Sequence, residues 1–189
     1  HGSIPCGATN KSYKMKKKIP FICLVIFCLF SVFLKPAMAE VKSSPRIASF
    51  WEKLQEGAVV QCKLCPRKCV IQDGSRGFCT VRVNKNGVLY TLGYGNPVAL
   101  HIDPIEKKPF FHVAPGEKVF SLAVAGCNMR CLFCQNWQIS QAKPDEVDRY
   151  SMSPEEIIDA TIKSNCRFIA YTYTEPTVFY EYMLEIAKL

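Results

Sequence analysis

The sequence lacks any stripe of lysine and arginine interleaved with aromatic residues, although its 189 residues carry a formal net charge of +8. The first 40 residues contain six lysines and Glu40, a net charge of +5, which leaves +3 for Val41 onward. A mildly basic chain without such a stripe does not have the electrostatic surface of a nucleic-acid-binding protein. We therefore predict no nucleic-acid partner.

The sequence also lacks an apolar run of the length that a membrane-spanning helix needs, about 20 residues. Residues 19–34 are apolar, follow the basic segment 15–18 and precede the small residues 37–39. This order of basic, apolar and small residues is typical of a secretory signal. We predict cleavage after Ala39, with an uncleaved membrane anchor as the alternative. Met15 is a better candidate than His1 for the first translated residue.

What the sequence has in abundance is cysteine, 11 in 189 residues. Cys127, Cys131 and Cys134 stand in one short segment, and no further cysteine or histidine follows before Cys166. Zinc sites normally close with a fourth ligand at short spacing, and iron–sulfur clusters that only transfer electrons usually take four thiolates. Three thiolates predict a [4Fe–4S] cluster with one iron left open for a small molecule. The distant Cys166 is predicted to be a buried small hydrophobe.

The segment around these cysteines has the pattern of parallel β/α units. The apolar run 119–125 predicts a buried strand that delivers the cysteine loop from its C-terminal end. Ser153, Pro154 and Glu156 are the signals of a helix start, and that helix is predicted to run to about Ser164. A second strand over 167–173 and a second helix over 177–189 follow. Alternating strands and helices favour a parallel sheet.

A second cysteine group precedes these units. Its members are Cys62, Cys65, Cys69 and Cys79, in a segment punctuated by glycine. Four thiolates can close a tetrahedral site, and both zinc and a second iron–sulfur cluster accept four cysteines. Structural disulfides are the alternative if this segment is secreted.

The remaining segments carry weaker patterns. Asn86-Gly87 predicts a hairpin between residues 81–83 and 88–90. Residues 43–45 are typical of a linker, and Ile47, Phe50, Trp51 and Leu54 have the spacing of a short amphipathic helix over 47–57 whose apolar stripe faces a core.

The triplet Cys-x3-Cys-x2-Cys, with Phe133 before its last cysteine, resembles the signature of the radical SAM superfamily. The resemblance implies that the open iron binds S-adenosyl-L-methionine (SAM), which the reduced cluster cleaves to a 5′-deoxyadenosyl radical. Residues 172–176, Thr-Tyr-Thr-Glu-Pro, resemble the Gly-Gly-Glu-Pro motif of that family, which meets the SAM ammonium. The cofactor-binding residues implied are Phe133, Thr174, Glu175 and Pro176. Alternatively, Glu175 caps the next helix.

Four motifs in order extend the resemblance over most of the chain: Cys-Lys-Leu-Cys-Pro-Arg-Lys-Cys, Asp-Pro-Ile-Glu-Lys-Lys-Pro, Gly-Cys-Asn-Met-Arg-Cys-Leu-Phe-Cys-Gln-Asn and Tyr-Thr-Tyr-Thr-Glu-Pro. Together they are similar to the radical SAM enzymes of the AmmeMemoRadiSam system, relatives of the pyruvate formate-lyase activating enzymes. The resemblance implies hydrogen abstraction from a protein or a small molecule, and an electron donor such as flavodoxin or ferredoxin.

The fold class expected is α/β, a partial (β/α)6 barrel that the chain contains only to about its second β/α unit. We expect four regions: the upstream and signal-like residues 1–40, a linker with a short helix over 41–60, the Cys-rich segment 61–117, and the start of the radical SAM core over 118–189.

Export and radical chemistry conflict, because an oxidising compartment pairs thiols and the chain has no twin-arginine pair for carrying a folded enzyme across a membrane. Two alternatives therefore stay open. The signal-like segment is either an export or anchoring signal or part of a cytoplasmic enzyme. The rival function is an exported, non-catalytic Cys-rich zinc or disulfide module.

Overall fold

The structure is a computed structural model, and it describes residues 45–54 and 57–189. The signal-like segment and Cys6, Cys23 and Cys28 lie outside the described residues. Among the residues that are described, none of the helices combines the length and the apolar character needed to cross a membrane.

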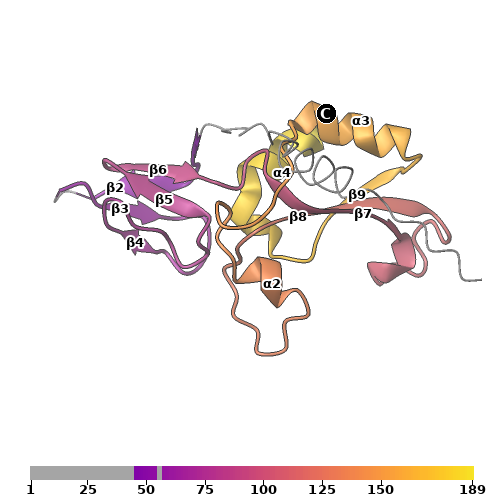
Figure 1. Cartoon of the computed structure of the whole chain (residues 1–189), viewed down its shortest axis with the longest axis horizontal. Coiled ribbons are helices and arrows are strands. Elements are labelled where there is room, and N and C mark those ends of the chain that lie inside the picture. Colours follow the sequence, from indigo (N-terminus) through magenta and orange to yellow (C-terminus); the bar gives the residue numbers. More distant parts are fainter. Residues whose placement is uncertain (1–44, 55–56) are drawn as a thin grey trace, which may run out of the picture. The chain divides into compact units, whose positions relative to one another are not determined.

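Two small antiparallel sheets form the first part of the described chain (Figure 1). The first has the order β1-β6-β5 and the second the order β2-β3-β4. Their strands are β1 (Arg46–Ile47), β2 (Trp51–Lys53), β3 (Val60–Cys62), β4 (Val70–Ile71), β5 (Arg82–Lys85) and β6 (Val88–Thr91). The predicted hairpin is confirmed, because β5 pairs with β6 through Asn86 and Gly87, which both have the positive φ that a tight hairpin turn needs.

The short helix predicted over 47–57 is wrong. Ile47 pairs with Tyr90 of β6, and Trp51 pairs with Cys62 of β3, so backbone groups that a helix would use internally bond to other strands. Phe50 between them has a φ of 56°, outside the helical region. The apolar side chains of this segment were also predicted to face a core, but two of them, Ile47 and Phe50, are exposed.

The third sheet has the order β7-β8-β9, with β7 (Pro97–Pro104), β8 (Lys118–Val124) and β9 (Phe168–Tyr171). β8 and β9 are parallel, and the connection between them contains α2 (Trp137–Ser140) and α3 (Pro154–Lys163). This confirms the predicted strand-helix-strand order and a mixed α/β fold. β7 pairs antiparallel with β8 and was not predicted as part of this sheet.

The helices begin where their capping signals stand. Ser153 and Glu156 form the predicted capping box, in which the Ser153 hydroxyl accepts from the Glu156 amide and the Glu156 carboxylate accepts from the Ser153 amide. The predicted last helix opens as a 3-10 turn, η2 (Pro176–Phe179), and continues as α4 (Tyr180–Lys188). Another 3-10 turn, η1 (Ile105–Lys107), follows β7.

The main hydrophobic core joins the third sheet to the Cys-rich segment. Leu122 and Val124 of β8 pack in one cluster with Phe179, and Cys79 and Val81 from the turn before β5 belong to the same cluster. Cys166 is buried there too, as predicted. A smaller core of Ala48, Val60, Cys62, Ile71 and Leu89 lies between the first two sheets. The turn that carries Cys79 is thus fixed against the strand that leads to Cys127.

One buried ion pair strengthens this junction. The guanidinium of Arg82 donates to both carboxylate oxygens of Glu181 in α4, each at 2.9 Å, and both side chains are almost fully buried. The amide of Ser49 also donates to Glu181. Breaking such a pair by removing one partner typically costs about 3–5 kcal/mol, because the other charge stays buried.

Candidate functional site

The loop that carries the cysteine triplet begins at Gly126, directly after β8. Gly126 has a φ of 90°, in the region that only glycine adopts freely, and its amide donates to the carbonyl of Ile139. A Cβ at this position would lie 2.4 Å from the carbonyl oxygen of Cys79 and 2.6 Å from Cγ2 of Val81. The loop therefore starts in close contact with the turn that carries a cysteine of the second group.

The structure places the three predicted cluster ligands in one loop, all as free thiols. Cys127 is buried, Cys134 is half-buried and Cys131 is exposed. The amide of Met129 donates to the sulfur of Cys127 at 3.4 Å, and the sulfur of Cys134 lies 3.4 Å from the hydroxyl of Ser140. Hydrogen bonds to sulfur are among the interactions that set the reduction potential of an iron–sulfur cluster. The three thiols and the groups beside them therefore fit the predicted cluster.

The sulfur atoms of the triplet are not gathered around a common point. Within residues 45–54 and 57–189, no three His, Cys, Asp or Glu side chains are arranged so that they could hold a metal ion. The assignment of Cys127, Cys131 and Cys134 as cluster ligands therefore stays a prediction from the sequence that the loop position supports.

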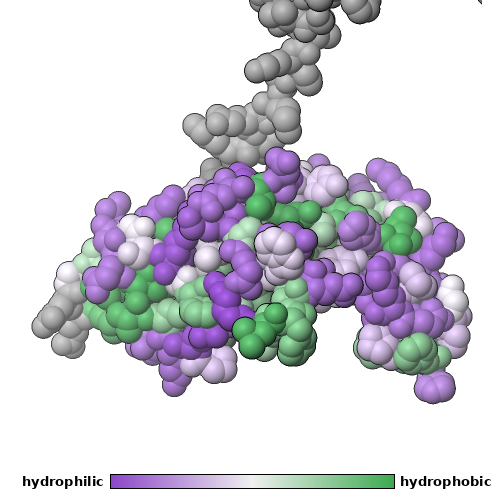
Figure 2. Space-filling view, turned by 60° about the horizontal axis from the view of Figure 1, so that its bottom comes forward, coloured by the Kyte–Doolittle hydropathy of each residue, from purple (hydrophilic) through white to green (hydrophobic). Residues whose placement is uncertain are grey.

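The same loop exposes large apolar side chains. Leu132 and Phe133 are almost fully exposed, and Met129 is half exposed. Figure 2 shows one face of the molecule, on which apolar surface occurs in separate patches between hydrophilic ones. Phe133 is thus accessible to a molecule bound beside the loop, and its predicted contact with the cofactor stays a prediction.

The segment 172–176 follows β9 and is held against the end of β8. The hydroxyl of Thr174 is buried and donates to the carbonyl of Val124 at 2.9 Å. Tyr173 has a φ of 65°, the conformation that glycine adopts most readily, which agrees with its alignment to a glycine of the Gly-Gly-Glu-Pro motif. The structure therefore brings this segment close to the root of the cysteine loop.

Glu175 caps the following helix in this structure. Its carboxylate accepts from the hydroxyl of Thr177 at 2.6 Å and from the Thr177 amide at 3.4 Å. This is the alternative role that the sequence left open for Glu175. Contacts of Glu175 and Pro176 with a cofactor stay predictions.

A charged network that the sequence analysis missed lies beside this segment. Asp103 of β7 accepts hydrogen bonds from Lys107, Lys108 and the hydroxyl of Tyr173. Burial alone would raise the pKa of Asp103, but these donors outweigh it and hold the pKa well below its usual value. Burial and the Asp103 bond raise the pKa of Tyr173 to about 12. Asp103 is therefore ionised and Tyr173 protonated at neutral pH.

This network borders a cleft of about 440 Å³, which is lined by His101, Asp103, Asn136 and Tyr173 among others. The i,i+4 spacing of Asp103 and Lys107 could have indicated their pairing from the sequence. The contact with Tyr173 could not, because it depends on how β7 and β9 flank β8.

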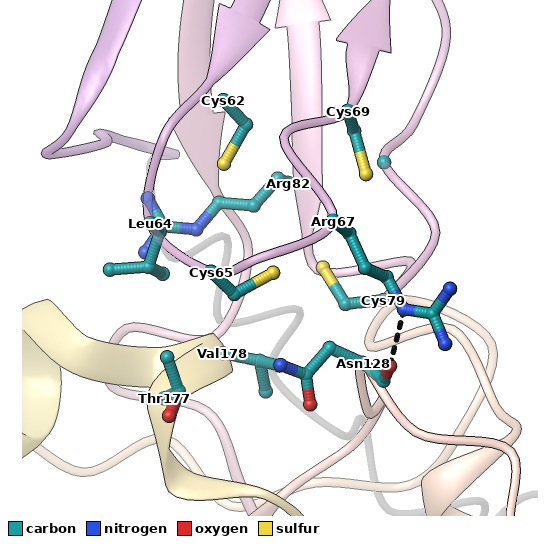
Figure 3. Close-up of a pocket in the computed structure, with 11 residues that line it drawn as sticks. Cys62, Leu64, Cys65, Arg67, Cys69, Cys79, Arg82, Asn128, Thr177 and Val178 are labelled. Carbon is teal, nitrogen blue, oxygen red and sulfur yellow. Dashed lines mark hydrogen bonds between the residues drawn. The ribbon is translucent and has the colours of Figure 1, made fainter.

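The second cysteine group converges on one pocket, although its members come from separate segments. Cys62 ends β3, Cys65 and Cys69 lie in the loop before β4, and Cys79 precedes β5. Figure 3 shows their four sulfur atoms facing a shared space, beside Arg82. All four are free thiols. Burial raises the pKa of the Cys62 and Cys79 thiols.

The Cys-rich segment also touches the cysteine loop through a stack of three side chains. Two guanidinium groups lie over the ring of Phe78, with the Arg67 Cζ 3.4 Å and the Arg130 Cζ 4.4 Å from its centroid. Arg130 also donates to the carbonyl of Phe78, and Arg67 donates to the carbonyl of Asn128, the bond dashed in Figure 3. Cation–π stacking depends on tertiary packing, so no sequence pattern indicated these residues.

The sequence profile of the radical SAM superfamily matches residues 122–189, from the middle of β8 to the last residue. These residues form a radical SAM domain. The domain contains the triplet Cys127, Cys131 and Cys134 and the segment 172–176, whereas the four cysteines of the second group lie before it. Domains of this superfamily use a [4Fe–4S] cluster and SAM as cofactors.

Two curated proteins of Methanocaldococcus jannaschii are similar to the chain that carries this radical SAM domain. The uncharacterized protein MJ0808 is 57% identical over 144 residues, which are 76% of this chain and 43% of that protein. The uncharacterized protein MJ0674 is 26% identical over 103 residues, 54% of this chain and 25% of that protein. The chain thus spans less than half the length of the curated relatives it matches. No solved structure matches it.

Proposed function

We propose that the full-length protein is a radical SAM enzyme whose [4Fe–4S] cluster is held by Cys127, Cys131 and Cys134. The observation that carries the proposal is the position of three free thiols in one loop at the C-terminal end of β8, inside the radical SAM domain. When bound, the cluster supplies the electron that cleaves SAM to a 5′-deoxyadenosyl radical, which abstracts hydrogen from the substrate.

The chain's own residues would position SAM beside this loop. The C-terminal edge of parallel strands is where β/α barrels hold their active sites, and both the cysteine loop and residues 172–176 follow such edges. The bond from Thr174 to Val124 ties the two edges together. We propose that backbone carbonyls of this segment and Glu175 accept hydrogen bonds from the SAM ammonium, with Phe133 and Pro176 beside the bound cofactor.

For the substrate, we propose a protein or a small molecule from which the radical abstracts hydrogen, with a flavodoxin or ferredoxin as the electron donor. The support is the order of the four motifs, which resembles the AmmeMemoRadiSam and pyruvate formate-lyase activating branch, and we propose the partial (β/α)6 barrel of that family for the complete core. The parallel pair β8 and β9, with α3 in the connection, agrees with the beginning of such a barrel.

Cleavage of SAM by the full-length protein tests the proposal. The protein is reconstituted anaerobically with iron and sulfide, reduced with dithionite and incubated with SAM, and the products are measured by mass spectrometry. We expect 5′-deoxyadenosine and methionine, and neither product in the sample without dithionite. Protein that contains zinc but no iron and leaves SAM intact would favour the non-catalytic zinc module instead.

A further inference from the structure

We propose that the pocket formed by Cys62, Cys65, Cys69 and Cys79 binds a single zinc ion through four thiolates, as a structural site separate from the radical SAM cluster. The first support is convergence. Three segments spread over 18 residues direct four free thiols toward one pocket, as Figure 3 shows. A set of four thiolates is a common structural ligand set for zinc.

Two backbone hydrogen bonds close the loop that carries Cys65 and Cys69. The amide of Cys62 donates to the carbonyl of Cys69 at 2.9 Å, and the amide of Lys68 donates to the carbonyl of Cys65 at 3.2 Å. These bonds close the loop that brings Cys65 and Cys69 to the pocket, which Cys62 and Cys79 also line. In the structure no three of these sulfur atoms are close enough together to hold an ion. Binding therefore requires them to close in, by rotation about the Cα–Cβ bonds between staggered positions.

Arg82 provides an independent observation that points to a missing hydrogen-bond acceptor in this pocket. Its side chain lines the same pocket and is 1% exposed. Two of its nitrogens are bonded to Glu181, but its Nε is the only guanidinium nitrogen in the described part of the chain that is buried without a hydrogen-bond partner. A buried donor left unpaired costs about 1–3 kcal/mol.

A zinc ion with four thiolates carries two net negative charges. Sulfur atoms of such a complex are acceptors for N–H groups, and interactions of this kind around the first ligands orient them and tune the metal. Once the metal is bound, the unpaired Nε of Arg82 would donate to one of these sulfurs. Metal binding would therefore satisfy a donor that the protein alone leaves unpaired.

The space between the four thiols is small, with room for roughly one water-sized body, about 20 Å³. A structural zinc site closes with four ligands of this kind and keeps no open position. We assign zinc on this ligand set, and metal analysis distinguishes it from a cluster, which four cysteines also allow.

The metal site would stabilise the position of the radical SAM loop, which carries Cys127, Cys131 and Cys134. Asn128 of that loop and Thr177 of η2 line the same pocket, and the carbonyl of Cys79 touches Gly126. An ion that fixes Cys65, Cys69 and Cys79 would hold the Arg67–Phe78–Arg130 stack in place. The radical SAM loop is then supported by a metal site that takes no part in the chemistry.

The test is the zinc and iron content of the full-length protein, isolated from cells and measured by mass spectrometry. We expect roughly one zinc per chain in the wild type, in Cys131→Ala and in the matched control Cys166→Ala. In Cys65→Ala we expect zinc to fall to near zero. Because Cys131→Ala removes a ligand of the other cluster, its retained zinc separates this proposal from the proposed radical SAM function.

A second measurement covers the case in which Cys65→Ala fails to fold. In the Cys131→Ala protein, zinc is exchanged for cobalt(II), and we expect the intense visible and near-ultraviolet bands of a tetrahedral tetrathiolate complex. A wild-type protein without zinc, a [4Fe–4S] cluster that is retained in Cys131→Ala but lost in Cys65→Ala, or cobalt bands of an octahedral oxygen site would each overturn the proposal.

Discussion

Replacing Cys131 with alanine is expected to abolish both the SAM-binding cluster and SAM cleavage in the full-length protein. The cluster has three protein ligands, so the variant would leave only Cys127 and Cys134 to hold it. Cys131 is exposed, and an exposed side chain contributes within about 0.5 kcal/mol to stability, so the fold should survive. Iron, sulfide and 5′-deoxyadenosine formation measure the outcome, and circular dichroism checks the fold.

The matched control is Cys166→Ala, which also removes a free cysteine but changes the hydrophobic core rather than the loop. This variant should keep its iron and its SAM cleavage. Unchanged SAM cleavage in Cys131→Ala would remove Cys131 from the ligand set. Equal loss of iron in both variants would show that the effect is general unfolding.

Replacing Gly126 with alanine is expected to destabilise the full-length protein by about 3 kcal/mol and to lower its cluster content. Left-handed backbone costs a residue with a Cβ about 1–2 kcal/mol, and overpacking adds about 1–3 kcal/mol. The atoms in the way are the Cys79 carbonyl and Val81, which lie in the core and cannot move freely. Relief of the contact would displace the loop that carries Cys127. Urea denaturation and iron content measure the two effects.

Gly116→Ala is the matched control, because Gly116 also has a positive φ, 81°, but no atom lies within 4 Å of a Cβ built there. Only the backbone strain of about 1–2 kcal/mol should remain. If the two variants are equally stable, the contact between the radical SAM loop and the Cys79 turn is not the tight junction described above.

Local signals predicted the radical SAM segment well. The apolar run before Gly126 is β8, the capping box at Ser153 starts α3, and β9 is parallel to β8. Each of these depends on residues close together in the sequence, where capping geometry and hydrophobic runs decide the structure. The cysteines of both groups were proposed as ligands from their spacing alone, which is also a local signal, and their role as ligands stays a prediction.

Features that depend on distant partners were not predictable. The stripe around Phe50 has helical spacing, but pairing with β3 and β6 overrides it. The antiparallel strand β7 and the bond from Tyr173 to Asp103 arise from strand order, which a local pattern does not contain. The stack of Arg67, Phe78 and Arg130 joins residues 63 positions apart. These contacts connect the Cys-rich segment to the radical SAM domain.

The most direct test of the central claim is electron paramagnetic resonance of the anaerobically reconstituted, reduced, full-length protein, recorded with and without SAM. We predict the signal of a reduced [4Fe–4S] cluster whose spectrum changes when SAM is added, because SAM would bind the iron that Cys127, Cys131 and Cys134 leave open. A cluster spectrum that is the same with and without SAM, or the absence of any reducible cluster, would contradict the assignment.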